Sequence, residues 1–297
     1  MRMKILSACL LLTPFSANAL EVFACEPEWA ALTEELAGDI AEITVATTAF
    51  QDPHRLQAKP SLIAAVRDAD LVICTGADLE IGWLPLLLRR AGNARIQVGN
   101  PGNFMAADYV RKLEVPKIVD RAQGDIHPQG NPHVHLDPRN IRRVATALAE
   151  RLRELDAANA ANYESRHSDF QERWSAAMVG WEERKLRLSG LQLASHHRSF
   201  SYLARWLDLN IVATLESKPG IPPSGAQLAT LLEALMPVAP SAVIRTPYEN
   251  EKPSLWLSKR LNIPDLILPY TVGGDDAVDD LFSLFGETLQ ILEEQTR

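Results

Sequence analysis

The stretch Ala157–Leu188, AANAANYESRHSDFQERWSAAMVGWEERKLRL, largely decides the fold of this chain. It contains no proline and a single glycine, Gly180. Its large apolar side chains recur at spacings of seven, four, four and three, which places them on one face of a helix: Tyr163, Phe170, Trp174, Met178 and Trp181. At 1.5 Å per residue such a helix would be roughly 45 Å long. That length predicts a stiff connection between two domains, with the aromatic face packed in a core.

A second helix is expected immediately before this stretch. Asp137 is a favoured N-cap residue, and Pro138 is preset for the first helical turn. We therefore expect a helix from Pro138 to about Leu155.

Short β-branched or apolar runs alternate with helical patterns on both sides of the long helix. The alternation is typical of βα units that build parallel sheets. On the N-terminal side, strands are expected at Val22–Cys25, Ile43–Thr47, Leu71–Thr75 and Ile96–Val98, with helices at Trp29–Ala37, Ser61–Asp68 and Trp83–Ala91. On the C-terminal side, strands are expected at Leu191–Ser195, Ile211–Ala213, Ala242–Arg245 and Leu266–Leu268, with helices at Phe200–Leu207, Gly225–Leu235, Ser254–Leu261 and Val278–Glu294.

The predicted fold class is therefore α/β, with two doubly wound α/β lobes joined by one long rigid helix. We expect an N-terminal lobe over residues 20–155, a linking helix over 156–188 and a C-terminal lobe over 189–297.

The N-terminus has the pattern of a secretory signal peptide. Arg2 and Lys4 precede the apolar run Ile5–Phe15, and a small-x-small site follows with cleavage expected after Ala19. Cys9 follows a lipoprotein-like Leu-Ser-Ala, but the apolar stretch continues beyond it, which disfavours lipid attachment there. No segment is long and apolar enough to span a membrane. The expected mature chain is exported and periplasmic, without direct membrane insertion.

The net charge of the chain argues against polyanionic partners. Removing residues 1–19 takes away two basic residues and no acidic ones, so the formal charge changes from −8 to −10. An acidic chain is unsuited to nucleic acid and to anionic membrane surfaces.

Two cysteines remain after residue 19, namely Cys25 and Cys74. Each lies near the end of an expected strand, so a disulfide is possible if the two strands are neighbours. Two buried free thiols are the alternative, and the sequence leaves the choice open.

Six of the seven histidines fall in three clusters. His54 directly follows Pro53, and His133 directly follows Pro132 in a segment that also holds His127 and His135. His196 and His197 follow the apolar run Leu191–Ala194. The seventh, His167, lies among charged residues of the long helix and is expected on its surface.

The position of these clusters suggests a metal site. In doubly wound sheets, ligands bind outside the carboxyl ends of the strands, and the cluster of His196 and His197 follows such an end. Converging imidazoles are the ligands that zinc prefers, at about 2.0–2.1 Å in a tetrahedral arrangement. We therefore expect a zinc site in the crevice at the carboxyl ends of the strands.

At this point the chain resembles a known family, the periplasmic solute-binding proteins of ABC importers for zinc and manganese. The resemblance covers essentially the whole mature chain. It rests on Phe50-Gln-Asp-Pro-His54 with Lys59-Pro60, on Leu79-Glu80, on Asn131-Pro-His133-Val-His-Leu-Asp-Pro138 and on Ser195-His-His197-Arg-Ser-Phe200. It implies two α/β lobes joined by a long helix, with one metal ion between them.

Carried over residue by residue, the resemblance implies His54, His133 and His197 as ligands. A late-loop aspartate usually supplies the fourth. Asp275 is the first choice here, because Gly273 and Gly274 precede it; Asp276 or water is the alternative. His135 is an alternative to His133. Three imidazoles favour Zn²⁺ over Mn²⁺, which prefers oxygen ligands.

Two further features surround the expected ligands. Glu216 or Glu249 is a candidate to orient a ligand imidazole through its second nitrogen. Asp125 and His127 belong to a short segment, Asp120–His135, that either forms an accessory site or is a solvated loop.

The expected function is high-affinity zinc capture outside the cytoplasm by a monomeric, non-enzymatic protein, followed by delivery to the membrane subunit of an ABC permease. The permease is implied by the resemblance alone. The alternative is a secreted zinc-dependent hydrolase, because His133-x-His135 resembles the ligand pair of some metal-dependent hydrolases. Against this alternative, the pair precedes a long helix and no HExxH motif occurs.

Overall fold

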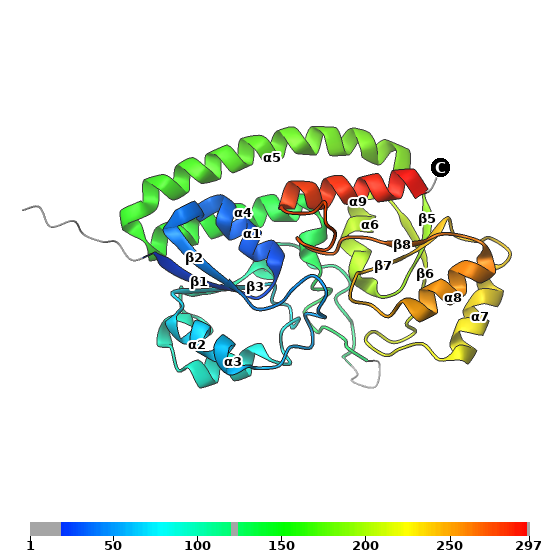
Figure 1. Cartoon of the computed structure of the whole chain (residues 1–297), viewed down its shortest axis with the longest axis horizontal. Helices are drawn as coiled ribbons and strands as arrows, with labels where there is room; N and C mark the ends of the chain where they lie inside the picture. Colours follow the sequence, from blue (N-terminus) through cyan, green and yellow to red (C-terminus); the bar gives the residue numbers. More distant parts are fainter. Residues whose placement is uncertain (1–18, 120–123, 296–297) are drawn as a thin grey trace, which may run out of the picture.

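A computed structural model describes residues 19–119 and 124–295 of the chain. It contains two four-stranded parallel sheets, one in each half, with long helices running across the top of both (Figure 1). The expected signal peptide, residues 1–19, lies outside the described residues apart from Ala19. Within the described ranges, no helix is long and apolar enough to cross a membrane.

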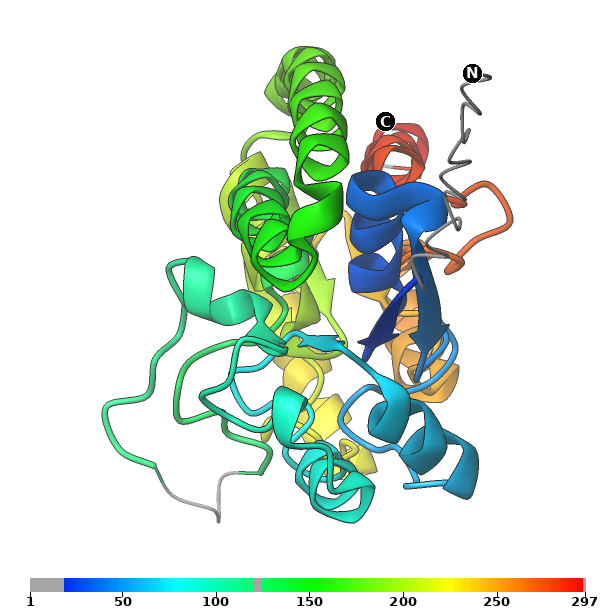
Figure 2. The ribbon, with the colours of Figure 1, turned by 90° about the vertical axis from the view of Figure 1, so that its left-hand side faces the viewer.

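The N-terminal sheet has the strand order β2-β1-β3-β4. Its strands are β1 (Leu20–Ala24), β2 (Ala41–Val45), β3 (Leu71–Cys74) and β4 (Asn103–Met105). The helices α1 (Pro27–Ala37), α2 (Pro60–Asp68) and α3 (Leu84–Ala91) lie between them in sequence. Figure 2 shows α1 above the sheet and the α2–α3 layer below it. β3 is buried along its whole length because it is a central strand covered on both faces.

The C-terminal sheet repeats this order as β6-β5-β7-β8. Its strands are β5 (Gln192–Ser195), β6 (Asn210–Thr214), β7 (Ala242–Arg245) and β8 (Asp265–Ile267), with α6 (Ser201–Leu207), α7 (Gly225–Leu235) and α8 (Glu251–Leu261) between them. The helix α7 begins at a capping box, in which Ser224 and Gln227 satisfy each other's backbone N–H groups.

Three long helices, α4 (Pro138–Leu155), α5 (Ala160–Leu188) and α9 (Leu281–Gln295), lie above the sheets (Figure 1). α4 begins at Asp137, whose side chain accepts from the backbone N–H of Arg139. α5 runs the length of the molecule, and α9 lies beside it (Figure 1). The aromatic face of α5 packs against α9: the ring of Trp174 lies 4.9 Å from that of Phe282 and 5.6 Å from that of Phe285. The predicted long helix with a buried aromatic face is confirmed.

One predicted strand is wrong. Residues 96–98 form the end of a short 3₁₀ turn (Ala94–Ile96) and a loop, in which Ile96 is buried and Val98 is 81% exposed. The fourth strand is β4, which follows Gly102. A Cβ at Gly102 would lie 2.5 Å from the carbonyl oxygen of Asp70, so only glycine permits this approach to the neighbouring chain.

The two cysteines form a disulfide, which settles the choice that the sequence left open. β1 and β3 are adjacent and parallel, and their ends place the Cα atoms of Cys25 and Cys74 4.8 Å apart. Both residues are fully buried. The bond therefore links the carboxyl ends of two central strands directly below the cleft.

Candidate metal centre

Three histidines from separate segments converge between the lobes. One nitrogen from each of His54, His133 and His197 lies within 4.8 Å of the others. Their ring centroids are 5.7–6.1 Å apart, and the rings meet edge to face. Among the residues that the structure describes, no carboxylate belongs to this group.

His54 comes from the loop between β2 and α2. Asp52 Oδ1 accepts from the backbone N–H of His54 at 3.0 Å and lies 2.8 Å from its Nδ1. The indole of Trp83 donates to the carbonyl of Pro53 at 2.8 Å, which anchors the loop to the start of α3. Burial tends to raise the pKa of Asp52, but the hydrogen bonds and charge of His54 outweigh it, and the net shift is downward. Asp52 is thus a carboxylate that accepts from His54 Nδ1–H.

His133 precedes α4 and is almost fully buried, with 1% of its surface exposed. Its backbone N–H donates to Asn131 Oδ1, and its Nδ1 lies 2.7 Å from the hydroxyl of Tyr270. Asn131 Nδ2 also donates to the carbonyl of Arg198 at 2.9 Å, so one side chain joins the loops of His133 and His197.

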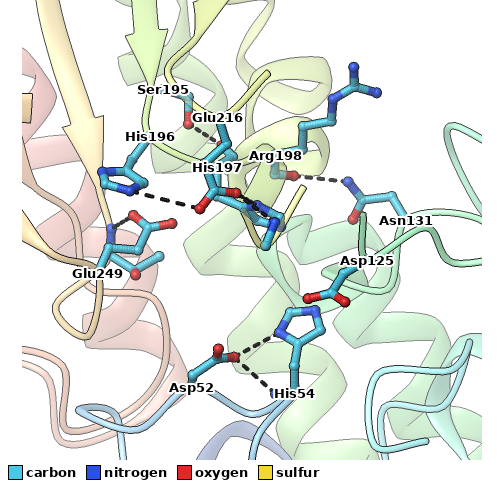
Figure 3. Close-up of polar contacts among 12 residues, drawn as sticks. Asp52, His54, Asp125, Asn131, Ser195, His196, His197, Arg198, Glu216 and Glu249 are labelled. Atoms are coloured by element: carbon cyan, nitrogen blue, oxygen red, sulfur yellow. Dashed lines mark hydrogen bonds and ion pairs between the residues drawn. The ribbon is translucent and has the colours of Figure 1, made fainter. Parts of the chain in front are cut away.

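His197 follows β5 in the C-terminal lobe. Its Nδ1 lies 2.8 Å from Glu216 Oε2, so the prediction that Glu216 orients a histidine is matched by the geometry (Figure 3). Glu249 does not take this role, because its Oε2 accepts from the backbone N–H of Thr246.

The three Nδ1 atoms are thus occupied by Asp52, Tyr270 and Glu216. The carboxylates of Asp52 and Glu216 accept Nδ1–H, which fixes the tautomer of His54 and His197 and leaves Nε2 free to bind a metal ion. The hydroxyl of Tyr270 holds the ring of His133 in place. Burial, followed by the charges of His197 and His54, holds the pKa of His133 well below its usual range. His133 is therefore neutral, the form that binds a metal.

A fourth histidine lies beside His54. His127 Nε2 lies 3.2 Å from His54 Nε2. Burial, with the charges of His54 and His197, lowers the pKa of His127 to about 4, so this ring is also neutral near pH 7. The sequence predicted an accessory site or a solvated loop for this segment, and the described part, residues 124–135, lies against the histidine cluster. Residues 120–123 of the segment lie outside the described residues.

The structure does not bring Asp275 or Asp276 to the histidines. Both are exposed, and Asp275 Oδ1 accepts from the backbone N–H of Ala277. Gly273, at φ +80°, bonds through its N–H to the carbonyl of Val278 and folds the loop back on itself. Tyr270 is the residue of this loop that reaches the cluster.

The chain as a whole matches a known family model. Residues 22–295 match the model described as zinc-uptake complex component A, periplasmic. This chain belongs to that family. The fold agrees: a crystal structure of ZnuA superposes with a TM-score of 0.78 at 22% identity, covering 94% of this chain and all of that one.

Relatives of this chain differ in the metal that their names give. The zinc-binding lipoprotein AdcA of Streptococcus pneumoniae serotype 4 is 25% identical over 68% of this chain and 40% of that protein. The manganese ABC transporter substrate-binding lipoprotein PsaA of the same species is also 25% identical, over 84% of this chain and 79% of that protein. A manganese-bound periplasmic metal-binding protein from Candidatus Liberibacter asiaticus superposes with a TM-score of 0.75 at 16% identity, covering 93% of this chain and 99% of that one.

Membership of the zinc-uptake family makes this protein a metal-binding, substrate-binding protein of the ABC transporter type and not an enzyme. The hydrolase alternative is therefore set aside. The second histidine on which it depended, His135, lies apart from the cluster. His135 is fully buried, donates its Nε2–H to the carbonyl of Tyr270 and places Nδ1 3.2 Å from Glu28 Oε1.

His196 also stays outside the group of three. Its Nε2 lies 4.0 Å from Glu216 Oε1, and Figure 3 shows its ring on the far side of Glu216 from His54. Burial lowers the pKa of His196, and burial raises that of nearby Glu249 to about 8. Both side chains are therefore mainly neutral at pH 7.

Three residues that support the ligands were not predicted from the sequence. Asp52 had a local signal, because an aspartate two residues before a histidine can bond both its backbone and its ring. Asn131 similarly precedes His133 by two positions. Tyr270 had no such signal, since 137 positions separate it from His133.

A pair of buried carboxyl groups lies beside the disulfide, at the ends of β1 and β3. Glu80 accepts from the backbone N–H groups of Thr75 and Gly76, and Glu26 accepts from Thr75 as well. Burial raises the pKa of Glu80 to about 7. Burial and the neighbouring charges of Glu80 and Glu28 raise the pKa of Glu26 well above its usual range. The pair therefore retains a proton near neutral pH.

This pair predicts a contribution to the stability of the metal-free protein that decreases as the pH rises. A carboxyl group whose pKa is raised on folding stabilises the fold fully below its unfolded value of 4.5, and the contribution is lost as the pH rises through about 7. The contribution of Glu80 is roughly 3 kcal/mol. The buried histidines with a lowered pKa act in the opposite direction, so the contribution of Glu80 is measured as a difference: we expect the free energy of unfolding in urea of the parent minus that of Glu80→Gln to fall between pH 5 and pH 8.

The matched control for this pH profile is Glu233→Gln, an exposed position on α7. It should follow the parent at every pH. A Glu80→Gln profile that is parallel to the parent would show that the pair does not hold the proton.

Proposed function

We propose that this protein captures zinc in the periplasm and delivers it to the membrane subunit of an ABC permease. The observation that carries the proposal is the nitrogen-only group of His54, His133 and His197, each with its Nδ1 already engaged. Imidazole nitrogens suit zinc, whereas manganese prefers carboxylate and water oxygens. Delivery to a permease is supported by the family, whose named members include substrate-binding lipoproteins of metal ABC transporters.

We further propose that His127 completes the tetrahedron in place of Asp275. A zinc ion with four nitrogen ligands at 2.0–2.1 Å has nitrogens about 3.3 Å apart along each edge. The 3.2 Å separation of His127 Nε2 and His54 Nε2 is close to that edge. The nitrogens of His54, His133 and His197 need to approach one another by up to about 1.5 Å from their present separations of up to 4.8 Å, and His127, which lies outside that group, needs to approach the other two rings as well.

The proposed mechanism is retention by rigid imidazoles. Asp52 and Glu216 are anions that share charge with the bound ion through His54 and His197, while Tyr270 remains a neutral phenol because burial raises its pKa. Release requires the segments that carry the histidines to separate, which the permease would favour by binding the open form.

Metal competition tests the proposal. Metal-stripped protein, with residues 1–19 removed, is titrated with zinc and with manganese in the presence of a chelator of known affinity. We expect one zinc ion per chain and complete displacement of manganese at equal concentrations. Retention of manganese against zinc would contradict zinc as the cargo.

Two variants test the fourth ligand in the same titration. His127→Ala is expected to bind zinc at least about tenfold more weakly, because one metal–nitrogen bond is replaced by water. Asp275→Ala, the matched control, is expected to bind zinc like the parent. If Asp275→Ala bound zinc more weakly and His127→Ala bound it like the parent, Asp275 would be the fourth ligand. Zinc uptake by cells that lack this gene, with and without a plasmid copy, tests the delivery step.

A further inference from the structure

The segment Gly124–His127 docks on the loop after β6 in the other half of the molecule. The backbone N–H of Asp125 donates to the carbonyl of Pro219 at 2.8 Å. A Cβ at Gly124 would lie 2.3 Å from that same carbonyl oxygen, and a Cβ at Gly220 would lie 2.0 Å from Asp125 Oδ2. Glycine on each side therefore allows the two backbones to meet, and both adopt a positive φ. We call this contact the cross-lobe strap.

Arg55 ties the strap to the loop of His54. Its Nη2 donates to the carbonyl of Gly220 at 3.1 Å and lies 3.4 Å from Asp125 Oδ2. Its Nε lies 3.8 Å from Asp52 Oδ2, the carboxylate whose other oxygen holds His54. Arg55 therefore contacts all three segments that meet at the strap.

The strap is also connected to His197 by hydrogen bonds through Glu216. The backbone N–H of Gly220 donates at 2.8 Å to Glu216 Oε2, the same oxygen that accepts from His197 Nδ1. On the other side of the strap, Asp125 is two residues from His127. Arg55 is thus connected to His54 through Asp52, to His197 through Gly220 and Glu216, and to His127 through Asp125 and the chain that follows it.

The strap forms one wall of a cavity of about 200 Å³ that His54 and His197 also line. Figure 3 shows Asp125 beside His54, on the side facing His197 and Glu216. The rest of the lining includes Tyr248, Glu249 and Asn250 from the C-terminal half. An ion that leaves the histidines through this cavity passes the strap.

We propose that Arg55 is a positioning residue for zinc retention, which holds the strap closed over the bound ion. This inference rests on the proposed function. Arg55 itself binds no metal; it acts through Asp52, Gly220 and Asp125. Because its side chain is 64% exposed, each ion pair is individually weak, and the combined effect is expected mainly on the dissociation rate.

The test is the release of zinc from the loaded protein to an excess of a chromogenic chelator, followed by stopped flow. Arg55→Ala is expected to release zinc about tenfold faster than the parent, with one zinc ion still bound per chain. Arg55→Lys, which keeps the charge but loses the forked contact, is expected to fall in between. Arg89→Ala, at an exposed arginine on α3, is the control and should release zinc like the parent.

Three additional measurements separate positioning from general destabilisation. Raising the ionic strength should speed release from the parent and leave Arg55→Ala nearly unchanged, because the salt acts on the ion pairs of Arg55. Gly220→Ala should speed release without removing a charge, since its Cβ would push Asp125 away. The urea unfolding midpoint of metal-free Arg55→Ala should equal that of the parent.

The outcomes distinguish this inference from the proposed function. If the parent binds zinc tightly but Arg55→Ala and Gly220→Ala release it at the parental rate, the strap has no role in retention. If faster release appears together with an equal loss of stability in the metal-free protein, Arg55 is only structural. If the parent itself does not bind zinc, the proposed function fails first.

Discussion

Alanine at His54, His133 or His197 is expected to weaken zinc binding by about 10²- to 10³-fold in each case. Binding of structural zinc by four ligands is worth about 10–16 kcal/mol, which corresponds to roughly 3–4 kcal/mol per ligand. The loss at each position also leaves its Nδ1 partner, whether Asp52, Tyr270 or Glu216, without the imidazole. Chelator competition at pH 7 measures the loss.

His133→Ala carries an additional structural risk, because His133 is only 1% exposed and its removal leaves a hole beside Tyr270. The unfolding midpoint of each metal-free variant must therefore be compared with the parent. His167→Ala on α5 is the matched control, since its Nε2 bonds only Thr146 and Gln171 on the helical surface. Parental zinc affinity in all three ligand variants would show that the ion binds elsewhere.

Removing the Cys25–Cys74 disulfide is expected to cost about 4 kcal/mol of stability. The bond closes a loop with a sequence separation of 49, and the chain-entropy model assigns about 4 kcal/mol to a loop of that length. The double variant Cys25→Ala, Cys74→Ala should lose this free energy in urea unfolding. Alanine also avoids a reduced site, because the two sulfurs and Glu80 lie within 4.8 Å of one another and could otherwise bind added metal.

Reduction of the unfolded parent by dithiothreitol, followed by refolding in its presence, should reproduce most of the loss and so separate the covalent bond from side-chain packing. Zinc stoichiometry should stay at one per chain, because neither cysteine belongs to the histidine group. A double variant as stable as the parent would show that the bond constrains nothing in the unfolded chain.

Much of the fold follows from local patterns. Periodic apolar faces and caps located α4, α5 and α7 to within a few residues, because those signals lie within each helix. β4 was missed because Asn103–Met105 is short and weakly β-forming, and its pairing depends on the close approach at Gly102. The sequence could not decide between a disulfide and two free thiols for a related reason. Only the strand order shows that β1 and β3 are neighbours.

The residues of the candidate site likewise fall into those that a local sequence motif predicts and those that it does not. His54, His133 and His197 each lie in a local motif, and the structure brings those three together. The fourth position could not be read from sequence, since the direction of the 273–278 turn decides where Asp275 points. Tyr270, Arg55 and Gly220 act across the lobes, and no local pattern reports a contact between segments that meet only in three dimensions.

The position of α9 has a consequence for how the chain assembles. This last helix packs on α5 and also contacts α1, so the C-terminal end of the chain completes the N-terminal half. One continuous apolar core runs from Leu20 through Trp174 to Leu292. The two sheets are therefore not independent folding units, and removal of α9 would expose the part of the apolar face of α5 that packs on Phe282 and Phe285. We expect the whole molecule to melt in a single cooperative transition, because α9 joins the cores of both halves.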